Sequence, residues 1–173
     1  LNLIDMLIAM GAHISSGPAS RMIEVSGVAR LGGVRHRVIP DRNEAVSFSV
    51  AAMATGGDVL IRGAEAGHLE KFIAAIHEMG GWVRREQDGL RVSGTGDWRP
   101  AAIETAPHPG FMTDWQQPLS ILLTKAKGAS IIHETVYEDR LGYLKDLARM
   151  GGDITVSDEC LGGPACRFAG RTF

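Results

Sequence analysis

Two stretches of the chain place apolar side chains three or four residues apart. They consist of Leu69, Phe72, Ile73, Ile76 and Met79, and of Leu141, Leu144, Leu147 and Met150. Residues at this spacing share one face of a helix, so each stretch predicts a helix whose terminal methionine faces the core. Gly80 and Gly151 follow these methionines, and glycine is the residue that most readily ends a helix.

Further helices, strands and hairpins are predicted in the rest of the chain. Helices are expected over residues 45–55 and 118–127, with Asp41 and Asp114 as N-caps and Pro118 tolerated in a first turn. Glycines after each helix act as C-caps, and the β-branched runs 58–62 and 130–133 predict strands. Residues 82–85 and 90–93 form a hairpin through Asp88 and Gly89, and residues 153–156 and 165–168 form the last pair.

The same landmarks return about every 70 residues. Met-Gly pairs begin at Met10, Met79 and Met150, so successive pairs are 69 and 71 residues apart. Residues 57–62 match 128–133, and 39–42 match 112–115, at similar spacing. Such a period indicates a repeated structural unit, here of the order β-α-β-α-β-β, which makes the fold class α/β (α+β).

The beginning of the chain fits only the end of such a unit. Residues 1–25 match the end of a second helix and its hairpin, so we expect either a fragment or a partner segment on another chain. Residues 27–40 are rich in glycine and arginine. They are interpreted as an interdomain crossing, with a charged edge hairpin as the alternative.

Composition narrows the classes of function. The chain has 173 residues, 45% of them apolar, and a net charge of -2, which argues against a general nucleic-acid or membrane-surface binder. The chain lacks an apolar run of about 20 residues, a basic leader and a phosphate-binding glycine motif, so a soluble cytoplasmic domain is expected. Cys160 and Cys166 are interpreted as reduced thiols and not as a zinc site.

Two polar loops, residues 107–117 and 134–140, carry the candidate chemistry. Asp114 can act as a general base toward a sugar hydroxyl or serve only as a helix cap. Arg42 suits a phosphate or carboxylate, or forms a surface ion pair. In residues 134–140, the Val136 backbone and the Tyr137 ring can face a flat base, or the carboxylates and arginine can cap the next helix.

Three segments together resemble the UDP-N-acetylglucosamine 1-carboxyvinyltransferase (enolpyruvyl transferase) family. They are residues 105–114 (TAPHPGFMTD), 134–140 (ETVYEDR) and 149–154 (RMGGDI), and residues 39–44 resemble an earlier segment of that family. The likeness runs from about residue 24 to residue 166. Similarity to enolpyruvylshikimate phosphate synthase extends only to the broader fold.

The resemblance implies a fold, a reaction and a cellular role. The fold is an inside-out α/β barrel with three repeat units in each of two domains, present here incompletely. Residues 1–39 would be the end of a preceding unit and the crossing, and residues 40–173 two units of the second domain. The implied reaction transfers the enolpyruvyl group of phosphoenolpyruvate to the 3-hydroxyl of UDP-N-acetylglucosamine, without a cofactor or metal. It is the first committed step of peptidoglycan synthesis in the cytoplasm, and thereby serves cell-wall growth, cell shape and division.

The resemblance also assigns roles by position. Asp114 corresponds to the carboxylate that binds the sugar hydroxyl and accepts its proton, Arg42 to a catalytic arginine of the cleft, and Val136 and Arg140 to further substrate-binding positions. The family's lysine–asparagine pair, its mobile cysteine loop and its later arginines are missing, so the segment alone is expected to be inactive and to need the remainder of the enzyme. The alternatives are a paralogous transferase acting on another nucleotide, and a non-catalytic module that keeps the fold.

Overall fold

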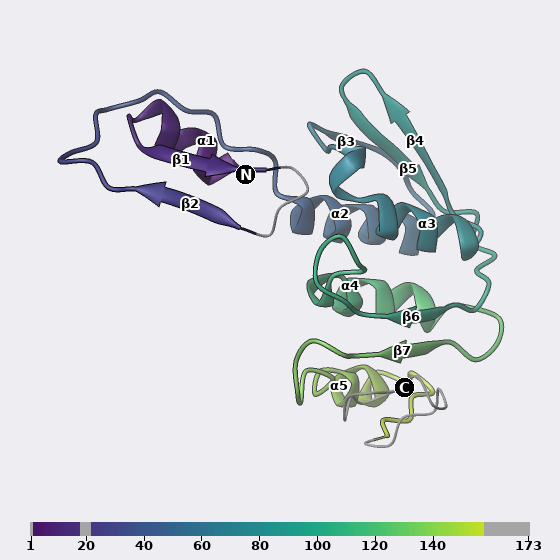
Figure 1. Ribbon diagram of the computed structural model, residues 1–173. Helices are drawn as coiled ribbons and strands as arrows, with labels where there is room; N and C mark the ends of the chain where they lie inside the picture. Colours follow the sequence, from purple (N-terminus) through teal and green to yellow (C-terminus); the bar gives the residue numbers. More distant parts are fainter. Residues whose placement is uncertain (1, 18–21, 158–173) are drawn as a thin grey trace. The chain divides into compact units, whose positions relative to one another are not determined.

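The computed structural model of the chain describes residues 2–17 and 22–157. The chain divides into two compact units, Leu1–Pro40 and Asp41–Phe173, called unit 1 and unit 2 below (Figure 1). Unit 2 contains the two polar loops that the sequence identifies as candidates, and it also contains the large apolar core.

Unit 1 contains one helix followed by one hairpin. Its elements are α1 (Asn2–Ala9), β1 (His13–Ser16) and β2 (Ile23–Ser26). The strands pair antiparallel with His13 opposite Ser26, as expected for the end of a repeat unit. Residues 27–40 contain neither helix nor strand, so the edge-hairpin alternative is wrong. Within unit 1, a hydrogen bond of 2.8 Å from the Gly32 amide to the Met10 carbonyl ties this segment to the end of the helix region.

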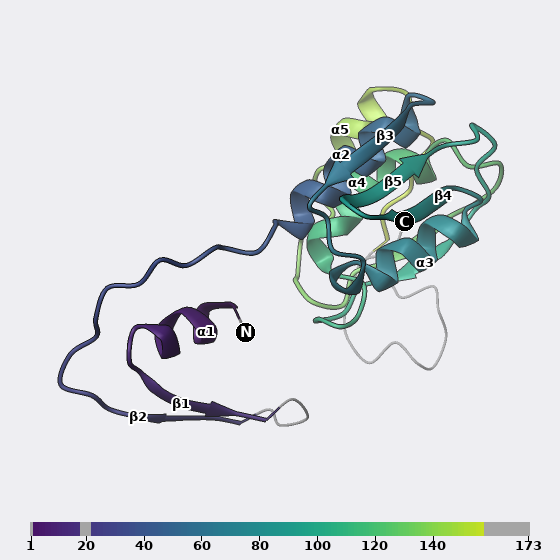
Figure 2. The ribbon, with the colours of Figure 1, turned by 90° about the horizontal axis from the view of Figure 1, so that it is seen from above.

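The first repeat of unit 2 packs two helices against an antiparallel sheet. Its elements are α2 (Arg42–Ala54), β3 (Asp58–Arg62), the short 3-10 helix η1 (Ala66–His68), α3 (Glu70–Glu78), β4 (Trp82–Glu86) and β5 (Gly89–Ser93). The strand order is β3-β5-β4, and the three strands lie side by side in Figure 2. Helix α2 packs on β3 and β5, and α3 packs on β4.

The predicted elements of this repeat are present with small shifts. Leu69, Phe72, Ile76 and Met79 are buried as expected, and Gly80 ends the helix region with a φ of +90°. The hairpin pairs Glu86 with Gly89, so its turn lies one residue earlier than predicted.

The second repeat begins with a strand and contains the candidate loops. Its elements are β6 (Ala102–Glu104), α4 (Thr113–Leu123), β7 (Ile131–His133) and α5 (Leu144–Arg149). Strands β6 and β7 pair in parallel, which places their carboxyl ends, and the loops that follow them, at the same edge. Helices α2 and α4 pack against each other and join the two repeats through a core that includes Val46, Val50 and Leu119.

Helix α4 begins earlier than predicted. It starts at Thr113 instead of Pro118, its N-cap is Met112 instead of Asp114, and Pro118 lies in its interior. Since proline has no N–H, the Asp114 carbonyl lacks its usual helical donor at this point. The predicted cap at Asp41 is confirmed, since its carboxylate accepts the Asn43 amide at 2.7 Å.

The end of the second repeat departs from the prediction. Met150, expected to face the core, is 83% exposed. Its counterpart Met79 is fully buried, and the Arg99 amide donates to the Met79 carbonyl. The corresponding position after Met150 falls among residues 158–173, outside the described residues. Residues 153–156 form no regular strand, and the predicted partner strand 165–168, Cys160 and Cys166 also lie outside the described part.

Candidate functional site

The loop between β6 and α4 is a tight turn held by its own backbone. The Ala106 amide donates to the Phe111 carbonyl at 2.8 Å, and the Gly110 amide donates to the Pro107 carbonyl at the same distance. A Cβ at Gly110 would lie 2.5 Å from the Ala106 Cβ, so a larger residue does not fit without movement. This turn delivers the chain to the first turn of α4, where Asp114 lies.

Asp114 is paired with Arg140 across two loops. A guanidinium nitrogen of Arg140 donates to Asp114 Oδ1, and the Arg140 Cζ lies 5.1 Å from the centre of the Tyr137 ring. The Asp114 side chain is 40% exposed and that of Arg140 is 27% exposed. Asp139 precedes Arg140 with a φ of +54°, a left-handed conformation that turns the chain just before the arginine. The pair is therefore held in place and remains accessible from solvent.

Glu134 is the most deeply buried carboxylate of this region. It is 1% exposed and follows directly after β7. Its Oε2 accepts hydrogen bonds from Thr113 Oγ1 and Gln116 Nε2, both at 2.7 Å. Its Oε1 accepts the amides of Val136 at 2.7 Å and Tyr137 at 3.0 Å. The Val136 amide is therefore already hydrogen-bonded within the protein, and the loop continues from Val136 to Arg140.

A tyrosine extends this polar cluster toward α5. The Tyr143 hydroxyl donates to Gln116 Oε1 at 3.0 Å. Burial raises the pKa of Tyr143 to about 12; the Glu134 carboxylate also raises it, while Ser120 and the Arg140 charge oppose the shift. Tyr143 therefore remains a neutral donor over the ordinary pH range.

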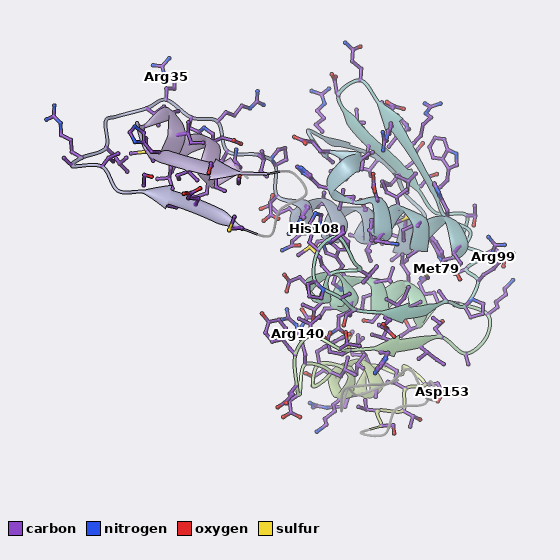
Figure 3. All side chains as sticks on the ribbon, viewed as in Figure 1. Arg35, Met79, Arg99, His108, Arg140 and Asp153 are labelled. Atoms are coloured by element: carbon purple, nitrogen blue, oxygen red, sulfur yellow. The ribbon has the colours of Figure 1, made fainter. Side chains whose placement is uncertain are left out.

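Arg42 lies at the first position of α2 and contacts the other candidate loop. Its Nη1 lies 3.4 Å from Nδ1 of His108. The next residue, Asn43, accepts a hydrogen bond from the buried Trp115 indole at 3.0 Å. Arg42 precedes Asn43 and Asp114 precedes Trp115, so the Asn43–Trp115 hydrogen bond joins the two segments that carry Arg42 and Asp114. His108 and Arg140 lie along one edge of unit 2 in Figure 3.

The structure brings the sequence candidates together unequally. Asp114 and Arg140 are in direct contact, and Val136 is joined to α4 through Glu134. The contact of Arg42 is with His108, in the same loop that leads to Asp114. The sequence alone did not predict that Glu134 is the buried carboxylate that holds α4 and the 134–140 loop together. A signal was present, because Glu134 lies two residues after the apolar Ile132, and side chains two residues apart in an extended segment point to the same face.

A sequence model of the family EPSP synthase (3-phosphoshikimate 1-carboxyvinyltransferase) matches residues 2–171. The chain belongs to the EPSP synthase family. This match covers both units.

Curated relatives place the chain near one branch of the family. It is 42% identical to a UDP-N-acetylglucosamine 1-carboxyvinyltransferase from Protochlamydia amoebophila over 174 residues, covering 100% of the chain and 37% of the relative. It is 44% identical to UDP-N-acetylglucosamine 1-carboxyvinyltransferase 1 from Halalkalibacterium halodurans over 170 residues, covering 97% of the chain and 38% of the relative. The resemblance seen in the sequence is confirmed, and the chain spans somewhat more than a third of the length of these relatives.

Solved structures show the same fold. The enolpyruvyl transferase NikO from Streptomyces tendae matches with a TM-score of 0.72 at 23% identity, over 98% of this chain and 38% of that one. An EPSP synthase from Acinetobacter baumannii matches with a TM-score of 0.50 at 15% identity, over 98% of this chain and 37% of that one. The predicted α/β class with incomplete enolpyruvyl-transferase repeats is confirmed.

A cavity in the described part of the chain lies away from the candidate site. A cavity of about 320 Å³ between α3 and the β4–β5 hairpin is lined by residues that include Ile73, His77 and Val83, and by none of the candidate site residues. Among residues 2–17 and 22–157, acidic, histidine and cysteine side chains form no group of three or more able to hold a metal ion. Within the same ranges, every helix is too short or too polar to traverse a bilayer.

Proposed function

We propose that the complete protein containing this chain transfers the enolpyruvyl group of phosphoenolpyruvate to the 3-hydroxyl of UDP-N-acetylglucosamine and releases phosphate. This is the first committed step of peptidoglycan synthesis, which we assign to the cytoplasm. The observation that carries the proposal is the match of the whole chain, at 42% identity, to a relative named for this reaction. The accessible Asp114–Arg140 pair supports it with suitable chemistry.

Asp114 is proposed as the base. As its carboxylate takes the proton of the sugar 3-hydroxyl, the hydroxyl oxygen bonds to C2 of phosphoenolpyruvate and the neighbouring methylene carbon gains a proton. Loss of that proton and of phosphate from the tetrahedral adduct restores the double bond. Arg140 donates a hydrogen bond to Asp114 Oδ1, so the carboxylate is held in one orientation before substrate arrives. The exposed fraction of 40% leaves the carboxylate open to a hydroxyl group.

Arg42 is proposed as a catalytic arginine of the cleft, and Val136 and Arg140, together with Asp114, are proposed to bind substrate. Arg42 has a planar guanidinium at a helix start, which suits a phosphate or carboxylate group. Val136 lies in the loop that Glu134 holds against α4, where its backbone is proposed to contact the uridine. Arg140 is proposed to contact the sugar nucleotide as well as Asp114.

The rest of the reaction needs chain outside these residues. We propose that residues 1–39 end a preceding repeat and cross between domains, and that residues 40–173 are two repeats of the second domain. The remainder of the enzyme would bind phosphoenolpyruvate and complete the cleft. The segment alone is therefore expected to be inactive.

A product assay with the complete protein tests the proposal. Incubation with phosphoenolpyruvate and UDP-N-acetylglucosamine is expected to release phosphate and give the enolpyruvyl sugar nucleotide by mass spectrometry. Parallel reactions with 3-phosphoshikimate, another UDP-sugar or no acceptor serve as controls. Phosphate release with a different acceptor only would overturn the proposed substrate, and no release with any acceptor would favour a non-catalytic module.

A further inference from the structure

Glu134 connects the start of α4 with the loop that follows β7. Its Oε2 accepts from Thr113 and Gln116 at the start of α4. Its Oε1 accepts from the Val136 and Tyr137 amides in the loop after β7. One buried side chain therefore binds both chain segments whose charged residues meet as the Asp114–Arg140 pair.

The geometry around Glu134 requires a group that accepts hydrogen bonds on both sides. Each oxygen accepts two bonds, which uses the acceptor sites of a carboxylate. The four donors are neutral and three of the bonds are 2.7 Å long. An amide at this position would present N–H groups toward donors on one side, and buried donors would lose their acceptor.

The position of Asp114 in α4 depends on the same bonds. Thr113 precedes Asp114, and Gln116 lies two residues after it, so the Oε2 bonds bracket the proposed base. The backbone provides less support here, because Pro118 supplies no N–H for the Asp114 carbonyl. Side-chain bonds to Glu134 therefore take a larger share in fixing this turn.

We propose that Glu134 is a positioning residue for the transfer reaction: it locks the Asp114 turn of α4 to the 134–140 loop, so that the base and Arg140 are presented together. This inference rests on the proposed function for its kinetic part. Glu134 does not touch the substrate in this scheme and acts through Asp114 and the loop.

The test uses Glu134→Gln in the complete protein. We expect kcat to fall by about 10- to 100-fold, because small displacements of a catalytic group have effects of this size. The KM for the sugar nucleotide should rise while the KM for phosphoenolpyruvate stays within about 3-fold, because the loop is assigned to the sugar side. Glu78→Gln is the matched control, since Glu78 is an exposed carboxylate on α3 in the other repeat, and it should leave all three constants unchanged.

A double-mutant cycle with Asp114→Asn separates positioning from general damage. If Glu134 acts through Asp114, Glu134→Gln should lower kcat much less in the Asp114→Asn background than in the wild type. Equal and independent losses in the two backgrounds would overturn the proposal. Should Glu134→Gln fail to fold, Thr113→Val removes one of the four donors and carries the same cycle, with an expected loss in kcat of about 10-fold.

Hydrogen exchange distinguishes this inference from the proposed function. Without any substrate, the amides of residues 134–140 should exchange faster in Glu134→Gln than in the wild type or in Glu78→Gln. Unchanged exchange in that loop would overturn the positioning role even if the enzyme proves active on the expected sugar. A different acceptor would overturn the proposed function and leave this exchange result intact.

Discussion

Arg140 donates to the Asp114 carboxylate across 26 residues of sequence, and the same guanidinium stacks over the Tyr137 ring. The proposed base is thus charge-paired before any substrate is bound. A hydroxyl group that reaches Asp114 therefore meets a carboxylate that Arg140 already orients, so little reorganisation of the base is needed when substrate binds.

Asp114→Asn should lower turnover much more than binding. The amide keeps the size of the side chain but removes the base, so we expect kcat to fall by about 10²- to 10⁴-fold. The Kd for UDP-N-acetylglucosamine, measured by calorimetry, should change by less than about 10-fold. Unchanged turnover would exclude the base role of Asp114.

Arg42→Lys should impair activity although it keeps the positive charge. Lysine cannot donate two parallel hydrogen bonds to a phosphate or carboxylate, so kcat/KM should fall by about 10-fold or more. Arg62→Lys on β3 is a suitable control, because Arg62 has no assigned role in the site. Wild-type kinetics in Arg42→Lys would remove this residue from the proposed site.

Asn43→Ala should destabilise unit 2. It removes the acceptor of the indole N–H of Trp115, a residue that is 1% exposed. A buried donor without an acceptor costs about 1–3 kcal/mol of unfolding free energy, measurable by urea titration. Asn43→Asp retains an oxygen and adds a negative charge near a helix start, so its stability should remain close to wild type. Equal losses in both variants would contradict this account of the bond.

Tyr143 should make stability depend on pH at the alkaline end. An unfolded tyrosine has a pKa near 10, while burial raises the pKa of Tyr143 to about 12 in the folded protein. The unfolded chain therefore loses this proton first, and the contribution of Tyr143 is lost as pH rises from about 10 to about 12. Urea unfolding across this range should show a decline that is smaller in Tyr143→Phe, and identical slopes would contradict the shift.

Much of the fold could be predicted because its signals are local. The period of Leu69, Phe72, Ile76 and Met79, and the glycines after helices, depend only on neighbours in sequence. Strand β3 begins and ends at the predicted residues. The start of α4 could not be predicted in this way, because Thr113 and Gln116 are held by Glu134, which is about 20 residues away and reaches them only in the folded chain.

The residues of the candidate site could be predicted from the sequence, but the contacts between them could not. The two polar loops are visible in the sequence, and parallel pairing of β6 and β7 brings them to one edge. Which carboxylate pairs with an arginine and which is buried depends on tertiary packing. Asp114, predicted as the N-cap of α4, instead pairs with Arg140. Glu134 accepts hydrogen bonds from four neutral donors.

The bond between Asn43 and Trp115 joins one repeat to the next. The counterpart of Asn43 in the second copy is Gln116, and the counterpart of Trp115 in the first is Arg42, so neither copy contains both halves of the bond. A second copy placed in the first position would set the longer glutamine side chain opposite the indole in place of Asn43. The two repeats share a fold, but at this contact each supplies a different partner and neither can replace the other without changing the bond.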